Sequence, residues 1–472
     1  MAARLAVAVV TFAPPLVLAR VMAPESYGTF KLAWLWCTTL GLVLPLGITS
    51  SLMYFVPHDR KRASIYFSHA LLFTNIAGAG AGLLLYAFGP AIALSIDKPE
   101  LAANMPWVAA FTALFVAGNT MDCIPMSLGR IKLAAALRFG YAATQAVGIA
   151  VGALVTHSVA GTFAGIVLAN GLRAAACWWM VLSQHGLKAS RAELRRQLAY
   201  ALPFGVAFAI IIPQQQFHQY FVSAQVSPAL FAIYAVGCFQ LPIVDMLYTP
   251  ISEVMQLGIA EHDRDGDRTG PQRLFHEAVA RLAFAFLPAM VLLWVCGPQL
   301  ITVLFTDRYA AAVPIFRVAI FAIPLAALPL DGVMKARAQN RFMLRVSVVK
   351  LLLTVTSVIL GFRWAGMVGA TAGWVAAEAL ARGILLVRTG QLLGSIRTVL
   401  PWRALAVQSM GALLAAPVAL IAMRLVAAKP AIQLAAGGAA FAASYLLALG
   451  LAGEIPAVRE LFPRRRAPRV AL

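Results

Sequence analysis

The stretch AVARLAFAFLPAMVLLWVCGPQLITVL (278–304) contains a single charged residue, Arg281. A helix needs about 20 predominantly apolar residues to cross the hydrocarbon core of a bilayer, so this stretch can span a membrane. The whole chain has the same character. Of its 472 residues, 61% are hydrophobic and 12% are charged, whereas a soluble domain has about 25% charged residues. The composition therefore excludes the water-soluble classes and predicts a polytopic membrane protein.

Charges, prolines and glycines divide the chain into about 14 such spans. They lie near 5–23, 29–52, 65–88, 104–126, 138–156, 160–182, 198–221, 229–256, 278–304, 311–333, 346–362, 366–387, 404–424 and 431–451. The connecting loops are short, and none is long enough to form a soluble domain. We therefore expect an all-α membrane protein of about 14 transmembrane helices.

The basic residues predict how the chain is oriented in the membrane. The chain has 38 Lys and Arg residues against 18 Asp and Glu, a net charge of +20. Most of the basic residues fall in alternate loops, such as HDRKRAS (58–64), QHGLKASRAELRRQ (184–197) and the tail VRELFPRRRAPRV (458–470). Because Lys and Arg collect in cytoplasmic loops, this pattern predicts an even number of spans with both termini in the cytoplasm. It also accounts for the positive charge without a nucleic-acid partner.

An internal repeat runs through the chain. PESYGTF (24–30) aligns with PALFAIY (228–234), and Ala160-Gly161 aligns with Ala365-Gly366, at an offset near 205. The repeat predicts two pseudo-symmetric six-helix lobes, 1–197 and 198–390, followed by two additional helices and a basic tail in 391–472. Parallel repeats of this kind are a transporter architecture, in which the substrate path lies between the halves.

Three segments resemble a known family. LARVMAPESYGTFKLAW (18–34), ITVLFTDRYAAAVPIF (301–316) and WAGMVGATAGWVAAEAL (364–380) are similar to elements of polysaccharide flippases. The family is the Wzx-type branch of the multidrug/oligosaccharidyl-lipid/polysaccharide exporter superfamily, and the similarity covers most of residues 1–390.

The resemblance implies a transporter and not an enzyme. Such a flippase moves undecaprenyl-diphosphate-linked oligosaccharide repeat units across the bacterial inner membrane by alternating access, in exopolysaccharide or O-antigen biosynthesis. The polymerase and chain-length proteins of the same pathway are then candidate partners.

Basic residues within or beside the spans are candidate ligands of the diphosphate. An ionisable residue at bilayer depth costs about 2.5–3.5 kcal/mol on insertion scales, so its presence calls for a reason. Arginine binds phosphate groups with paired donors. The candidates for a cationic cavity are Arg20, Lys31, Arg173, Arg317 and Lys350. The alternative is ion pairing between helices, for example of Arg173 or Arg317 with Asp122 or Asp245.

Two further groups of polar residues lie within the spans. Gln214, Gln215, Gln216, His218 and Gln219 follow Pro213 in one span. They cannot all face lipid without unmet hydrogen bonds, so they predict either a sugar-facing surface or a wet position near the outer interface. Asp122, Asp245 and Glu378 are candidates for coupling transport to an ion gradient, because a membrane carboxylate is the usual carrier.

Other functional classes find less support. The sequence has no GxxxxGK[ST] motif, and its five cysteines form no CxxC pair, so neither an ATP-driven pump nor a metal or cofactor site is predicted. A lipid II or drug exporter of the same superfamily remains an alternative. A membrane-embedded polysaccharide polymerase or ligase is disfavoured, because such enzymes tend to carry a long external loop.

Overall fold

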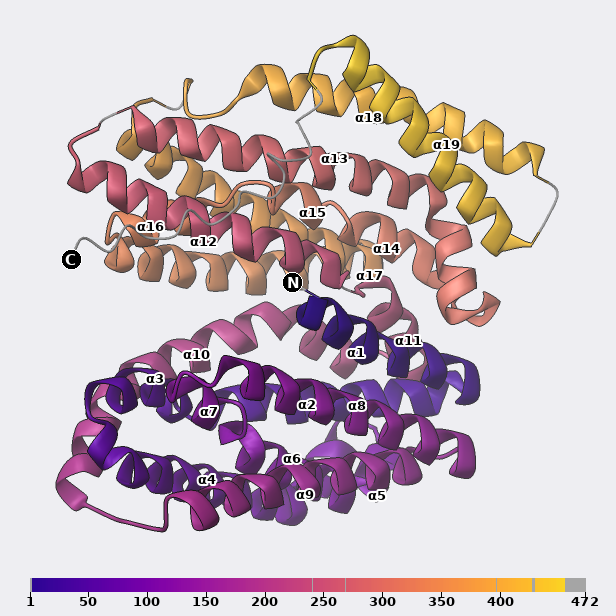
Figure 1. Ribbon diagram of the computed structural model, residues 1–472. Helices are drawn as coiled ribbons and strands as arrows, with labels where there is room; N and C mark the ends of the chain where they lie inside the picture. Colours follow the sequence, from indigo (N-terminus) through magenta and orange to yellow (C-terminus); the bar gives the residue numbers. More distant parts are fainter. Residues whose placement is uncertain (1, 240, 268, 396, 427–428, 455–472) are drawn as a thin grey trace. The chain divides into compact units, whose positions relative to one another are not determined.

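The computed structural model describes residues 2–239, 241–267, 269–395, 397–426 and 429–454 (Figure 1). All regular elements in these ranges are helices, so the predicted all-α polytopic fold is confirmed. Contacts divide the chain into two compact units, Met1–Val236 and Gly237–Leu472.

Besides the short 3-10 helices Arg60–Arg62 and Gly118–Thr120, the first unit is built from ten α-helices and the greater part of an eleventh. They are α1 (Ala2–Val21), α2 (Pro24–Val43), α3 (Ile48–His58), α4 (Ala63–Ser95), α5 (Pro99–Ala103), α6 (Met105–Ala117), α7 (Cys123–Ser127), α8 (Ile131–Thr156), α9 (Val159–Gln184), α10 (Arg191–Gln225) and α11 (Pro228–Gly237). A proline or a capping serine determines where several of these helices begin. Pro24 begins α2, and the hydroxyls of Ser158 and Ser190 accept from backbone amides of α9 and α10. A core around Leu52 and Phe67 joins α3, α4, α7, α9 and α10.

Besides the 3-10 helix Asp307–Ala312, the second unit contains the remaining α-helices. They are α12 (Pro242–Arg264), α13 (Gly270–Phe305), α14 (Val313–Ala319), α15 (Ala322–Leu325), α16 (Leu330–Ala336), α17 (Asn340–Leu393), α18 (Trp402–Leu425) and α19 (Pro430–Leu451). The helices α18 and α19 pack on each other and on α13 (Figure 1). Their interface is apolar, with Cys296, Met423 and Phe441 buried in it.

Eleven helical segments of the described residues are long and apolar enough to cross a membrane, or twelve if the bent pair α11 and α12 is one span. The sequence predicts about 14. Part of the difference lies in α1, whose apolar described part, Val10–Val21, is short. The rest lies in α17, which counts once but holds two predicted spans, 346–362 and 366–387. Ala365 and Gly366 have non-helical backbone angles and interrupt it.

The two arms of α17 fold back on each other at this break. A Cβ on Gly361 would lie 2.1 Å from the carbonyl oxygen of Gly369, and Ser357 Oγ donates to Gly373 O at 2.8 Å. The hairpin α8–α9 is built alike, since a Cβ on Gly148 would lie 2.5 Å from Gly165 O. Small residues let membrane helices approach closely, and here they hold two antiparallel hairpins together.

The predicted lobe boundary at 197–198 falls inside α10. This helix begins earlier than the predicted span 198–221, because the Ser190 cap allows it to start at Arg191. It packs against α2, α3 and α4, within the first compact unit. A compact unit is defined by contacts, whereas a repeat is defined by similarity between two parts of the chain. The boundary between the repeats at 197–198 therefore stays a prediction.

Candidate functional site

A cavity of about 430 Å³ lies within the first unit. The turn between α2 and α3 forms one wall, where Gly47 has a φ of 76° in the left-handed region that glycine tolerates. Helices α6 to α10 supply the remaining walls. The polar side chains in the lining are Asn119, Asp122, Arg138, Tyr141 and Arg173, together with Thr49 and Ser50.

Arg173 is the central cation of this cavity, although it is only 9% exposed. Its Nη2 donates to Asn119 Oδ1 at 3.3 Å, and its guanidinium carbon lies 4.2 Å from the centre of the Tyr141 ring. Its Nε and Nη1 atoms are buried, and neither finds a hydrogen-bond acceptor among the described residues. A buried charge that lacks a counter-ion is costly, and stacking on an aromatic ring offsets only part of that cost. The charge of Arg173 is therefore only partly compensated by its neighbours.

Among the described residues, Arg173 has no carboxylate within ion-pair distance. The alternative in which Arg173 pairs with Asp122 is thus not formed in this structure, although Asp122 lines the same cavity. Space for the arginine comes from a break after α6. A Cβ on Gly118 would lie 2.8 Å from Arg173 Cδ, so the side chain occupies the room that the glycine leaves.

A second cavity of about 330 Å³ lies within the second unit. Four of its five charged lining residues form ion pairs. Glu378 accepts from Lys350 Nζ at 2.5 Å and from Arg382 Nε at 2.7 Å. Arg382 also donates to backbone carbonyls in and after α15. Asp331 accepts from the Tyr248 hydroxyl and from Lys335 Nζ. The second cavity therefore holds nearly balanced charge.

The two cavities can be compared residue by residue through the glycines at which the helices of each hairpin touch. Gly152 and Gly161 approach each other in α8–α9, as Gly361 and Gly369 do in α17. The two hairpins can be aligned on these glycine pairs, at an offset a few residues longer than the one found in the sequence. In this alignment, polar residues that line or adjoin one cavity match polar residues of the other. Asp122 then matches Asp331, Arg173 matches Arg382, and the Tyr141–Asn170 hydrogen bond of 3.0 Å matches the Lys350–Glu378 ion pair. The first unit has a neutral pair where the second has an ionic one, which leaves Arg173 uncompensated.

Three of the five predicted cations belong to the first unit and two, Arg317 and Lys350, to the second. Arg173 and Lys350 line separate cavities. Arg20 is exposed at the end of α1, and Lys31 lies with Nζ 5.6 Å from the centre of the Tyr27 ring. Arg317 stacks on Trp294 at 4.7 Å and donates to its carbonyl.

The glutamine cluster of α10 divides between two faces. Gln214 and His218, one helical turn apart, are buried, and His218 Nδ1 lies 2.8 Å from the Tyr234 hydroxyl. Gln215 is exposed, and Gln219 donates to Gln216 on a half-buried face.

The three predicted coupling carboxylates lie in the two cavities. Asp122 lines the first, and Asp245 and Glu378 line the second. Sequence reasoning missed Asp331, Arg382 and Tyr248. The first two lie near predicted span ends, where long side chains can reach water. The spacing of Glu378 and Arg382, one turn apart on a helix, is the signal that could have identified that pair.

Comparison with known proteins gives the family and the fold. A sequence profile described as polysaccharide biosynthesis protein matches residues 17–314. No curated protein matches the sequence. Among solved structures, the lipid II flippase MurJ in an inward closed conformation matches with a TM-score of 0.76 at 12% identity, covering 95% of this chain and 98% of that one.

Two other solved structures extend the likeness. An inward-facing multidrug resistance MATE family transporter of the MOP superfamily has a TM-score of 0.70 at 12% identity, over 83% of this chain and 95% of that one. A MOP superfamily transporter from Pyrococcus furiosus has a TM-score of 0.56 at 13% identity, over 84% and 96%. Likeness at such identity concerns the fold alone, whereas the profile covers more than half of the chain. The chain therefore belongs to the polysaccharide biosynthesis protein family, and the resemblance to Wzx-type flippases is confirmed.

Proposed function

We propose that the protein is a flippase that moves undecaprenyl-diphosphate-linked oligosaccharide repeat units across the bacterial inner membrane by alternating access. It makes and breaks no covalent bond of its cargo. Both termini lie in the cytoplasm, and the polymerase and chain-length proteins of the pathway receive the cargo on the other side. Family membership and a transporter fold support this proposal.

The observation that carries the substrate assignment is the buried Arg173 with two unused donors in the first cavity. A guanidinium in a low-dielectric site binds an oxyanion with charge-assisted hydrogen bonds, which are stronger than neutral ones. An anionic group of the cargo entering this cavity would satisfy the Nε and Nη1 atoms. The hydroxyls of Thr49 and Ser50 offer neutral donors and acceptors for sugar hydroxyls beside it.

Transport toward the outer leaflet requires a source of energy, and we propose Asp122 as the coupling carboxylate. Asp245 and Glu378 are less suited, because Glu378 is held by two cations and Asp245 is exposed. Asp122 shares the first cavity with Arg173 and forms no ion pair among the described residues. Proton or cation binding at Asp122 would change the net charge that the anionic cargo meets there.

The test is a strain that lacks this protein. Lipid-linked repeat units should accumulate on the cytoplasmic leaflet, and the wild-type gene should restore their delivery to the periplasm. Arg173→Gln should restore about one tenth of the wild-type rate or less, since it removes the charge from the cavity. Arg363→Gln, which changes an exposed arginine on α17, is the matched control. Normal delivery in the deletion strain would refute the flippase proposal, and full rescue by Arg173→Gln would refute the role of Arg173 alone.

A lipid II flippase is the second candidate, because the match to MurJ covers nearly the whole of both chains. Growth of cells depleted of their own lipid II flippase distinguishes the two. Rescue by this protein would favour lipid II as the cargo, and failure to rescue at normal expression would favour the oligosaccharide.

A further inference from the structure

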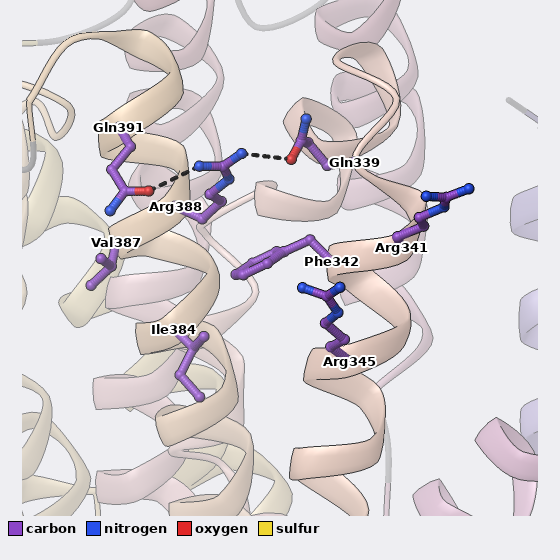
Figure 2. Close-up of a pocket in the computed structure, with 8 residues that line it drawn as sticks. All are labelled: Gln339, Arg341, Phe342, Arg345, Ile384, Val387, Arg388 and Gln391. Atoms are coloured by element: carbon purple, nitrogen blue, oxygen red, sulfur yellow. Dashed lines mark hydrogen bonds between the residues drawn. The ribbon is translucent and has the colours of Figure 1, made fainter.

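A third cavity, of about 600 Å³, lies at the open end of the α17 hairpin, where the first turns of one arm face the last turns of the other (Figure 2). Three of its eight lining residues are arginines, namely Arg341, Arg345 and Arg388, and none is acidic. Such a lining favours an anion.

Arg388 is fixed in this cavity by uncharged partners. Its Nη1 donates to Gln391 Oε1 at 3.1 Å and its Nη2 donates to Gln339 Oε1 at 2.9 Å, so its guanidinium lies between two amides (Figure 2). The ring of Phe342 lies 5.7 Å from its guanidinium carbon. Its Nε atom is buried and meets no hydrogen-bond acceptor in the part of the chain that the structure describes. The charge of Arg388 is therefore held in place but not neutralised.

Arg341 and Arg345 add two more cations on the opposite arm. They lie one helical turn apart, and both are exposed. Within the described part of the chain, neither forms a hydrogen bond or an ion pair. A pair of free guanidinium groups beside a fixed third one can surround a phosphate with several charge-assisted donors.

The position of the cavity along the hairpin indicates what carries that phosphate. The turn at Ala365 and Gly366 is about 20 residues from the cavity on either arm, or about 30 Å of helix, which is the thickness of the hydrocarbon core. The cavity thus lies near the level of lipid headgroups. Leu344, Val348 and Leu352 continue from it along one arm and are exposed, so they offer a surface for an acyl chain.

We propose that this cavity binds the phosphate group of an anionic lipid, with Arg341, Arg345 and Arg388 as its donors. The chemistry is shared by the phosphodiester of a bilayer phospholipid and the diphosphate of a polyprenyl carrier. Binding of a bilayer phospholipid does not depend on the proposed flippase function, whereas binding of the polyprenyl diphosphate would place part of the cargo here.

Native mass spectrometry of the purified full-length protein, titrated with single lipids, tests this. The probes are phosphatidylglycerol, undecaprenyl diphosphate and zwitterionic phosphatidylcholine. Arg341→Gln/Arg345→Gln should weaken binding of at least one anionic lipid about tenfold or more and leave phosphatidylcholine binding unchanged. The two positions are exposed and unpartnered, so the variant should fold. Arg363→Gln, at the other end of the same hairpin, is the control and should bind all three lipids like the wild type.

The anionic lipid that responds identifies the source. A loss confined to phosphatidylglycerol assigns the cavity to a bilayer lipid, and a loss confined to undecaprenyl diphosphate assigns it to the carrier. The proposal is overturned if the double variant binds both anionic lipids as the wild type does, or if Arg363→Gln weakens binding as much. Delivery of repeat units to the periplasm, measured separately, reports on the flippase proposal.

Discussion

Gly118 controls where the Arg173 side chain can lie. A Cβ at position 118 would approach Arg173 Cδ to 2.8 Å and Cγ to 2.9 Å, in the middle of the side chain and not at its flexible end. We therefore expect Gly118→Ala to displace the guanidinium from the cavity and to lower delivery of lipid-linked repeat units about as much as Arg173→Gln does. The measurement is the rate of appearance of these units in the periplasm of the complemented deletion strain.

Gly171 supplies the matched control. It lies on α9 half a turn before Arg173, and a Cβ there would meet only Leu114 Cδ1 at 3.9 Å, an ordinary contact. Gly171→Ala should leave transport unchanged. If Gly118→Ala also transports at the wild-type rate while the protein is present at equal amount, the position of Arg173 in the cavity does not matter for function.

Asp267 stabilises the start of α13 in a way that depends on pH. Its Oδ1 accepts from the amides of Thr269 and Gly270, and these bonds lower the pKa of its carboxyl to about 2. Because the folded pKa lies below the ordinary value of about 3.9, the stabilisation is complete above that value and is lost as the pH falls toward 2. Asp267→Ala should therefore lower the Tm by a few degrees at pH 7, and the difference from wild type should shrink steadily as the pH falls from about 4 to 2.

Thermal unfolding in detergent, followed by intrinsic fluorescence, measures both values. Asp265→Ala is the control, because Asp265 is exposed and its side chain pairs with Arg264 at the surface. A Tm difference for Asp267→Ala that stays constant from pH 7 to pH 2 would contradict the assigned role of the carboxylate.

At the scale of elements, the hairpin of α17 depends on a backbone contact that a single methyl group would obstruct. A Cβ on Gly361 would lie 2.1 Å from Gly369 O, whereas a Cβ on Gly383, in the same helix, would meet nothing within 4 Å. We expect Gly361→Ala to destabilise the protein by about 1–3 kcal/mol through overpacking. Gly383→Ala should be neutral or stabilising, because alanine favours a helix more than glycine does. Equal Tm values for the two variants would show that the arms are not in close contact.

The position of the break in α17 could be predicted from the sequence. Apolar runs set the positions of the spans, and the break between 346–362 and 366–387 coincides with the non-helical Ala365 and Gly366. The family and the all-α membrane fold were also predictable, since both follow from composition and local motifs. These features depend on neighbouring residues in the chain, which is why one sequence suffices to find them.

The candidate sites were less predictable, because they depend on which side chains meet. Arg173, Asp122 and Glu378 were identified as ionisable residues within spans, but their partners were not. Whether an arginine is compensated depends on contacts between distant residues, such as that between Arg173 and Asn119. Arg341 and Arg345 resemble ordinary loop cations in sequence, and the cavity appears only when the hairpin brings Arg388 beside them.

At the scale of the whole molecule, the α8–α9 and α17 hairpins share a framework but differ in the charges beside them. Both hairpins pack through small residues, and both units place a polar cavity beside the hairpin. Replacing the Lys350–Glu378 ion pair by the Tyr141–Asn170 hydrogen bond removes one charge of each sign and frees the arginine at the equivalent position. The proposed anion site then lies in the first unit, whereas the cavity of the second unit holds nearly balanced charge.

Parallel repeats require equivalent loops to lie on the same side of the membrane, and labelling of single cysteines can measure this. His157 and Trp364 are exposed at the turns of the two hairpins, and Ala189 and Ser395 are exposed beyond their open ends. The native cysteines in the described residues are buried or half-buried, so the labelling background is low. With the proposed orientation, His157→Cys and Trp364→Cys should react with an impermeant maleimide in intact spheroplasts. Ala189→Cys and Ser395→Cys should react only in inverted vesicles. If His157→Cys and Trp364→Cys label from opposite sides, the two halves are not parallel. If both label only from the cytoplasmic side, the repeat stands but the proposed orientation, with both termini in the cytoplasm, is reversed.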